Sequence, residues 1–236
     1  MRKFLRLIPT LFKNGYAWFL DYLYVSYWQI HSLLIRINED TYRQKQQGKA
    51  IPIILIPGIY ENWRFMKPIA DLLYKKGYDI HVVNELKYNT GTIEEMAELV
   101  KQYILSHSIS KCVIVAHSKG GLIGKYLLSN SGNSQTIKGM IALNTPFSGS
   151  RYAYLIPKKS IRIFLPKSPI LSQLASNTEV NRYIISIYGL FDPHVPKGSH
   201  LQGAKNIQLR TRGHFRVMNN SVVHSTILKE LATFED

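Results

Sequence analysis

The sequence predicts an α/β protein built on a mostly parallel central sheet with helices on both faces. From residue 51 onward, short apolar runs alternate with longer stretches in which apolar residues recur at helical spacing. The apolar runs are continuous, which is typical of strands buried on both faces of a parallel sheet. Strands that alternate with helices in this way form βαβ units, whose ligands bind at the carboxyl ends of the strands.

Several of the expected strands and helices begin or end at a recognisable sequence signal. The first strand is expected at residues 51–56, where the run IPIILI is closed by Pro57-Gly58. A helix follows over residues 65–76 and ends at Gly77. Thr-Ile-Glu-Glu at 92–95 is a capping box that opens a helix through about Ser106. The remaining expectations are strands at 78–83, 111–116, 139–143, 184–188 and 206–209, and helices at 120–129 and 222–234.

Residues 1–50 are expected to form an N-terminal helical extension that precedes the domain of residues 51–236. Basic residues flank an aromatic stretch at 15–37, and the polar segment 41–50 is expected to be a linker. The stretch is long enough to span a bilayer, but Asp21, Gln29, His31 and four tyrosines interrupt it. An amphipathic helix on a membrane surface fits better, with a packing helix and a true span as alternatives. No cleavable signal peptide is recognised.

The charge points to an anionic partner. The chain has 30 basic and 15 acidic residues, a net charge of +15, together with 15 Tyr, 9 Phe and 3 Trp. Abundant aromatic residues suit a lipid interface, and no nucleic-acid-binding motif accompanies the charge. Anionic lipid is therefore favoured over nucleic acid, with ordinary solubility as the alternative. The single cysteine, Cys112, excludes a disulfide framework, and we expect no metal, no cofactor and a cytoplasmic protein, peripheral on the inner membrane face.

A serine motif follows the strand expected at 111–116. The residues Ala116-His117-Ser118-Lys119-Gly120-Gly121 join that strand to a helix, which is the context of a nucleophile elbow, G-x-S-x-G. Alanine replaces the first glycine, and small residues are needed because the sharp turn brings strand and helix close together. Ser118 is the expected nucleophile, and His117 is expected to pack or hydrogen-bond behind the elbow. An ordinary strand-to-helix turn is the alternative.

Chain order narrows the acid and the base that would serve Ser118. The order is serine, then acid, then histidine. Asp192 directly follows an expected strand, which is where the acid is required. Glu179 instead lies at the start of an expected helix, where an acidic residue is common because the helix dipole stabilises it. His214 lies between the last strand and the last helix and is the expected base. His224 falls inside that helix, and His194 is expected to line the loop beside the acid.

With these parts in this order, the chain from about residue 51 resembles the α/β-hydrolase superfamily, and most of all its small lipases and esterases. Residues 143–150, LNTPFSGS, are similar to the Thr-Pro-x-x-Gly-Ser stretch that lipases carry after the strand following the elbow. The resemblance implies the α/β-hydrolase fold and ester hydrolysis through a Ser-His-Asp triad and an acyl-enzyme. It also implies an oxyanion hole from the backbone N–H groups of Lys119 and Ile59, with Pro57 in place of the usual histidine.

The family usually inserts a lid over the site at residues 147–180, which we call the lid segment. It combines apolar and aromatic residues with five basic ones, Arg151, Lys158, Lys159, Arg162 and Lys167. A lid for an acyl chain and an anionic headgroup or membrane is expected, and an ordinary surface loop is the alternative.

Two other functions remain open. The protein could be an acyltransferase or thioesterase with the same triad, or a non-catalytic binding protein. Acyl length, headgroup, oligomeric state and the role of Lys119, either solvent-facing or a positive potential for an anionic substrate, stay open.

Overall fold

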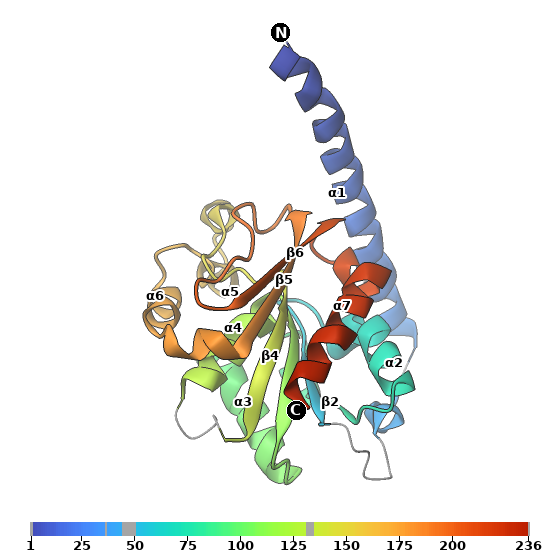
Figure 1. Cartoon of the computed structure of the whole chain (residues 1–236), viewed down its shortest axis with the longest axis vertical. Helices are drawn as coiled ribbons and strands as arrows, with labels where there is room; N and C mark the ends of the chain where they lie inside the picture. The colour runs from blue at the N-terminus through green and yellow to red at the C-terminus, as the bar shows by residue number, and fades with distance from the viewer. Residues whose placement is uncertain (1, 36, 44–50, 131–134, 236) are drawn as a thin grey trace.

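A single parallel sheet forms the centre of the protein (Figure 1). The computed structural model describes residues 2–35, 37–43, 51–130 and 135–235. Within them the sheet has the order β2-β1-β3-β4-β5-β6, and every neighbouring pair is parallel. The strands are β1 (Ile53–Ile56), β2 (Ile80–Val82), β3 (Cys112–His117), β4 (Ile137–Leu143), β5 (Ile184–Phe191) and β6 (Lys205–Arg212). Because the strand order reverses beside β1, a ligand crevice is expected at the carboxyl ends of β1 and β3.

Alternate residues of each central strand pack against different helices. On one face, residues such as Ile54 and Ile114 join a core with α3 (Ile93–Ser106) and α4 (Lys119–Ser129). On the other face, residues such as Ile53 and Val113 join a core with three further helices. These helices are α1 (Arg2–Leu34), α2 (Lys67–Lys75) and α7 (Ser221–Leu231). Burial on both faces explains why the strand sequences are apolar without alternation.

The predicted fold class is confirmed, and the sheet is parallel throughout its described strands rather than mostly parallel. The capping box at the start of α3 is present, with the Thr92 and Glu95 side chains each accepting from the other's backbone amide. β5 and β6 run three residues beyond their predicted ends because parallel pairing continues to Phe191 and Arg212. An apolar-run criterion misses the last residues of β6, because β6 is an edge strand whose end is polar and partly exposed.

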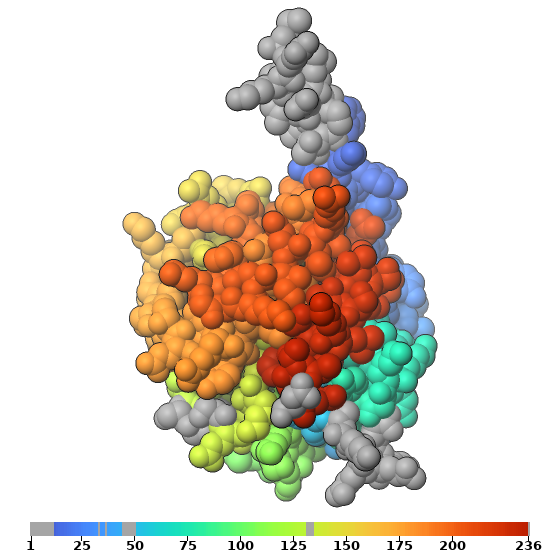
Figure 2. Space-filling view, viewed as in Figure 1, coloured from blue at the N-terminus to red at the C-terminus, as the bar shows by residue number. Residues whose placement is uncertain are grey.

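Most of the N-terminal segment folds as one helix of 33 residues, α1. Its buried side chains recur at helical spacing: Ala17, Asp21, Trp28 and Ser32. Part of α1 lies along the body, where it contacts β6, and its first turns project beyond the body (Figure 1). The orange-to-red carboxy-terminal part of the chain covers one face of the body beside this helix (Figure 2). Among the described helices, none combines the length and apolar character that crossing a bilayer requires.

The prediction of a linker over residues 41–50 is wrong for its first residues. Tyr42 is buried, and its hydroxyl donates to Asp71 Oδ1 at 2.6 Å. Arg43 forms an ion pair with Asp79 at 2.9 Å. An aromatic ring and a guanidinium group thus attach this segment to the body, although its composition is polar. Residues 44–50 of the predicted linker lie outside the described residues.

Candidate active site

Ser118 occupies the sharp turn between β3 and α4. Its backbone has φ +50° and ψ −118°, a conformation that a non-glycine residue adopts only under strain. A side chain at Gly120 would press against the carbonyl oxygen atoms of Ile56 and Pro57, so only glycine lets α4 approach β1 this closely. A side chain at Gly121 would likewise press against the side chain of Thr145. Two of the predicted elbow residues, Gly120 and Gly121, are therefore glycines because α4 packs too closely on neighbouring segments to leave room for a side chain.

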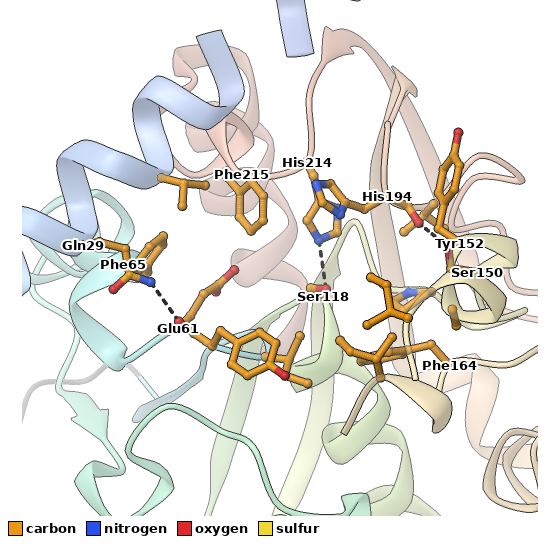
Figure 3. A pocket seen from close by; sticks show the side chains of 18 residues that line it. Gln29, Glu61, Phe65, Ser118, Ser150, Tyr152, Phe164, His194, His214 and Phe215 are labelled. Carbon is orange, nitrogen blue, oxygen red and sulfur yellow. Dashed lines mark hydrogen bonds between the residues drawn. The ribbon is translucent and has the colours of Figure 1, made fainter. Parts of the chain in front are cut away.

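Three residues from three strand ends are joined by hydrogen bonds, and Figure 3 shows the one between Ser118 and His214. His214 Nε2 lies 2.9 Å from Ser118 Oγ, and His214 Nδ1 lies 2.7 Å from Asp192 Oδ2. The second oxygen of Asp192, Oδ1, accepts hydrogen bonds from the amides of His194 and Val195 at 2.7 and 2.9 Å. The residues predicted as nucleophile, base and acid are thus brought together. Glu179 is exposed on a 3₁₀ helix (Glu179–Tyr183).

The groups around His214 and Asp192 shift the pKa values of both side chains. Burial acts to lower the pKa of His214, but the charge and hydrogen bond of Asp192, together with Asp21 and Glu61, raise it above its ordinary value. Burial acts to raise the pKa of Asp192, but the His214 imidazole and the hydrogen bonds from His214 and two amides hold it below its ordinary value. Asp192 therefore stays ionised beside an imidazole that holds a proton more tightly than a free histidine.

The two predicted oxyanion donors are backbone amides at the start of α4 and in the loop after β1. Lys119 is the first residue of α4, so its amide belongs to the helix end that has no carbonyl partner within the helix. On the loop after β1, the amides of Gly58 and Tyr60 are engaged, by Glu61 Oε2 at 2.7 Å and by the Tyr88 carbonyl at 2.8 Å. The Ile59 amide between them has no acceptor among the described residues, and Ile59 lines the same cavity as Ser118.

The side chain of Lys119 neither faces solvent nor points toward a substrate, the two roles considered from the sequence. It is fully buried, and its ammonium group donates to the carbonyl oxygens of Asn89, at 2.8 Å, and Gly91. Burial lowers its pKa to about 8. Asn89 in turn donates from Nδ2 to the Pro57 carbonyl at 2.7 Å. Through Asn89, the Lys119 side chain thus supports the loop that carries Ile59. It neither faces solvent nor lines the cavity.

His117 lies behind the elbow, where the sequence placed it. Its Nε2 donates to the His214 carbonyl at 2.9 Å, and its Nδ1 lies 2.9 Å from the Glu61 carboxylate. Asn144 Nδ2 donates to the same His214 carbonyl at 3.1 Å. Sequence reasoning missed Glu61 and Asn144. Asn144 directly follows β4, so the rule that functional residues follow strands could have found it.

An apolar cavity of about 320 Å³ opens above Ser118 and His214 (Figure 3). Val25 and Gln29 of α1 form one wall. The lid segment supplies the facing wall, with Ser150, Tyr152, Ala153, Ile156, Ile161 and Phe164. His194 also lines the cavity, and burial together with the nearby His214 lowers its pKa to about 3, so it remains neutral. In the described part of the chain, no cluster of three or more His, Cys, Asp or Glu side chains is arranged to hold a metal ion.

Residues 51–164 match the model of the alpha/beta hydrolase fold family. The fold and this match place residues 51–164 in the α/β-hydrolase superfamily. Solved structures agree. A mature lipase from Bacillus licheniformis is 15% identical, with a TM-score of 0.60 over 80% of this chain and 95% of that one.

Two further solved structures share the fold. A monoacylglycerol lipase from Paleococcus ferrophilus is 12% identical, with a TM-score of 0.57 over 78% of this chain and 96% of that one. An enol-lactonase from Burkholderia xenovorans is 13% identical, with a TM-score of 0.56 over 81% and 94%. At these identities the likeness shows the fold. No curated protein sequence matches the chain.

Proposed function

We propose that the protein hydrolyses carboxylic esters with apolar acyl groups, through an acyl-enzyme on Ser118. The observation that carries this proposal is the hydrogen-bonded chain Ser118–His214–Asp192 at the base of an apolar cavity. A serine hydroxyl is a weak nucleophile alone and becomes effective when a positioned base can take its proton. The cavity offers that serine a largely apolar environment, which suits an acyl chain.

The geometry supports a two-stage reaction. As Ser118 Oγ bonds to the ester carbonyl carbon, its proton passes to His214 Nε2, and the carbonyl oxygen becomes an oxyanion facing the Ile59 and Lys119 amides. The intermediate collapses, and the departing alcohol oxygen takes the proton from His214. Water then attacks the acyl-enzyme and gives a proton to His214, which returns it to Ser118 as the acid leaves. Asp192 keeps the imidazole in the tautomer that both stages require.

An acyl-chain series combined with covalent labelling tests this function. A fluorophosphonate probe is expected to label the protein, and p-nitrophenyl esters to be cleaved faster as the acyl chain grows beyond acetyl. Added alcohol that captures the acyl group in preference to water would instead favour an acyltransferase. A folded protein that neither takes the probe nor cleaves any ester or thioester of the series contradicts the proposal and favours a non-catalytic role.

The rate of ester hydrolysis is expected to fall in acid below a midpoint above pH 6.5. His214 must be neutral to accept the Ser118 proton, and its pKa lies above the ordinary 6.5 of histidine. A raised pKa keeps the imidazole protonated up to a higher pH, so the acid limb of kcat/KM moves upward. Initial rates from pH 5 to 9, with circular dichroism at each pH to detect unfolding, measure that limb. Full activity maintained well below pH 6.5 contradicts His214 as the base.

We also propose that α1 and the lid segment place the cavity against an anionic membrane surface, as on a cytoplasmic leaflet. Large apolar side chains cover the exposed face of α1: Phe12, Tyr16, Trp18, Phe19, Tyr22, Leu23, Tyr27, Ile30 and Leu34. Tyr154 and Leu155 of the lid segment are also exposed, beside basic residues such as Arg151 and Lys158. Apolar side chains that enter the interface and cations that face anionic headgroups bind such a surface together.

The double variant Phe19→Glu/Leu23→Glu is expected to weaken binding to anionic vesicles by at least about tenfold. Both side chains are half or more exposed on α1, so the change costs little folding energy but removes two apolar groups from the interface. Sedimentation with vesicles of phosphatidylcholine with and without phosphatidylserine measures it. Leu105→Glu, at a similarly exposed leucine on α3, is the matched control. Equal sedimentation of the double variant and the wild type contradicts the proposal.

A further inference from the structure

Helix α1 contributes a buried carboxylate to the back of the active site. Asp21 is fully buried and accepts hydrogen bonds from three consecutive backbone amides. Its Oδ2 accepts from His214 at 2.7 Å, and its Oδ1 accepts from Phe215 and Arg216, both at 2.9 Å. One side chain from the N-terminal helix therefore holds the loop that carries the candidate base.

The position of Asp21 on α1 reverses the usual pattern of a surface helix. It is the one acidic residue among the first 38, yet it lies on the buried face while aromatic side chains such as Trp18 and Tyr22 are exposed. A buried carboxylate is costly unless its oxygens are fully hydrogen-bonded. Three aligned amides meet that need, so the burial of Asp21 depends on the conformation of the His214 loop.

The backbone of His214 is held on both sides by side chains from elsewhere in the chain. Its amide donates to Asp21, while its carbonyl accepts from His117 at 2.9 Å and from Asn144 at 3.1 Å. The preceding residue, Gly213, has φ +108°, and a Cβ there would lie 2.7 Å from Asp21 Oδ1. The close approach of Asp21 to this loop thus requires glycine.

We propose that Asp21 is a positioning residue: its carboxylate fixes the backbone of His214 so that the imidazole stays aligned between Ser118 and Asp192. This inference rests on the proposed function for its kinetic consequence. Asp21 does not line the cavity, so it acts through His214 rather than on the substrate. α1 precedes the family-matched residues 51–164 and nevertheless holds the base. The helix that we propose to meet the membrane is therefore also part of the catalytic apparatus.

Asp21→Asn separates positioning from packing. The amide has nearly the same shape as the carboxylate, but one of its two polar atoms becomes an NH₂ group. That group faces either the His214 amide or those of Phe215 and Arg216, and two donors cannot hydrogen-bond to each other. We expect kcat to fall by about 10- to 100-fold, as for a small misplacement of a catalytic group, with KM within about twofold.

Ser32→Ala is the matched control. Ser32 is also buried on α1, and its hydroxyl donates to the Gln29 carbonyl rather than to the His214 loop. It loses a buried hydrogen bond of the same helix without touching the candidate base. We expect the kcat of this variant to stay within about twofold of the wild type. Equal losses in the two variants would mean that α1 acts by packing alone and would overturn the positioning role.

The pH profile gives a readout that packing alone does not move. The charged groups around His214 are Asp192 after β5, Asp21 of α1 and Glu61 after β1, and the histidines His117 and His194 also face it. Asp192, Asp21 and Glu61 favour the imidazolium form. Neutralising Asp21 therefore lowers the pKa of His214, and the acid limb of kcat/KM is expected to move to lower pH in Asp21→Asn. In Ser32→Ala the limb should stay in place.

Histidine NMR separates this inference from the proposed function. With ¹⁵N-labelled histidine, the His214 imidazole is identified by its loss in His214→Gln, and its titration is followed in the wild type and in Asp21→Asn. A lower pKa in the variant supports the charge contact even if the wild type cleaves no ester, a result that would sink only the proposed function. Unchanged kcat and an unshifted titration overturn the inference. If Asp21→Asn does not fold, the smaller Asp21→Ser carries the same comparison.

Discussion

The Ser118→Ala variant is expected to lose ester hydrolysis by about 10⁶-fold in kcat and to keep its fold. Ser118 Oγ hydrogen-bonds to His214 Nε2, and no other side-chain hydroxyl in the described residues does so. Alanine has no atom that can form the acyl-enzyme. The backbone strain at φ +50° is present in the wild type too, so the substitution adds little to it.

Stoichiometric labelling and rate measurements check this expectation together. Ser118→Ala should take no fluorophosphonate, while Ser129→Ala should be labelled like the wild type. Ser129 lies on the same helix, α4, and does not line the cavity, so it controls for loss of a serine from that helix. Thermal melting should show that both variants are folded. Substantial labelling or turnover by Ser118→Ala would place the nucleophile elsewhere.

The strands and the elbow could be predicted because their determinants are local. β3 is apolar at each of its first five residues, and the small residues around Ser118 reflect a contact between adjacent elements. The roles of Asp192 and His214 could also be predicted, since parallel strands bring their carboxyl ends to one edge of the sheet. Chain order then left few acids and histidines to choose from.

The residues that support the site could not be predicted, because they act over long distances in sequence. Asp21 meets the His214 amide 193 positions away, and Glu61 meets His117 across 56 positions. In the sequence, Asp21 is an acid that interrupts an apolar stretch, and local rules place such an acid in water. Lys119 shows the same limit. Buried lysines are rare, so both expectations for it kept the ammonium group within reach of solvent or substrate.

The Asp192→Asn variant is expected to retain its fold and KM but to lose about 10⁴-fold in kcat. Asp192 Oδ1 accepts from the amides of His194 and Val195, so asparagine must place its carbonyl oxygen there. Its NH₂ group then faces His214 Nδ1, which lies 2.7 Å from the Asp192 Oδ2 atom it replaces. A donor at Nδ1 moves the imidazole proton to Nε2, the atom that must accept the proton of Ser118.

Glu179→Gln is the matched control for that result, because it neutralises the other acid that sequence reasoning weighed. Glu179 is exposed and does not line the cavity, so its kcat is expected to stay within about twofold of the wild type. Steady-state kinetics on one p-nitrophenyl ester at the pH optimum, with circular dichroism on each variant, compares the two. A large loss in Glu179→Gln with little in Asp192→Asn would reassign the acid. The opposite result would show that the buried carboxylate acts by fixing the histidine tautomer, since the substitution keeps the shape and the amide contacts of Asp192 and changes the proton arrangement.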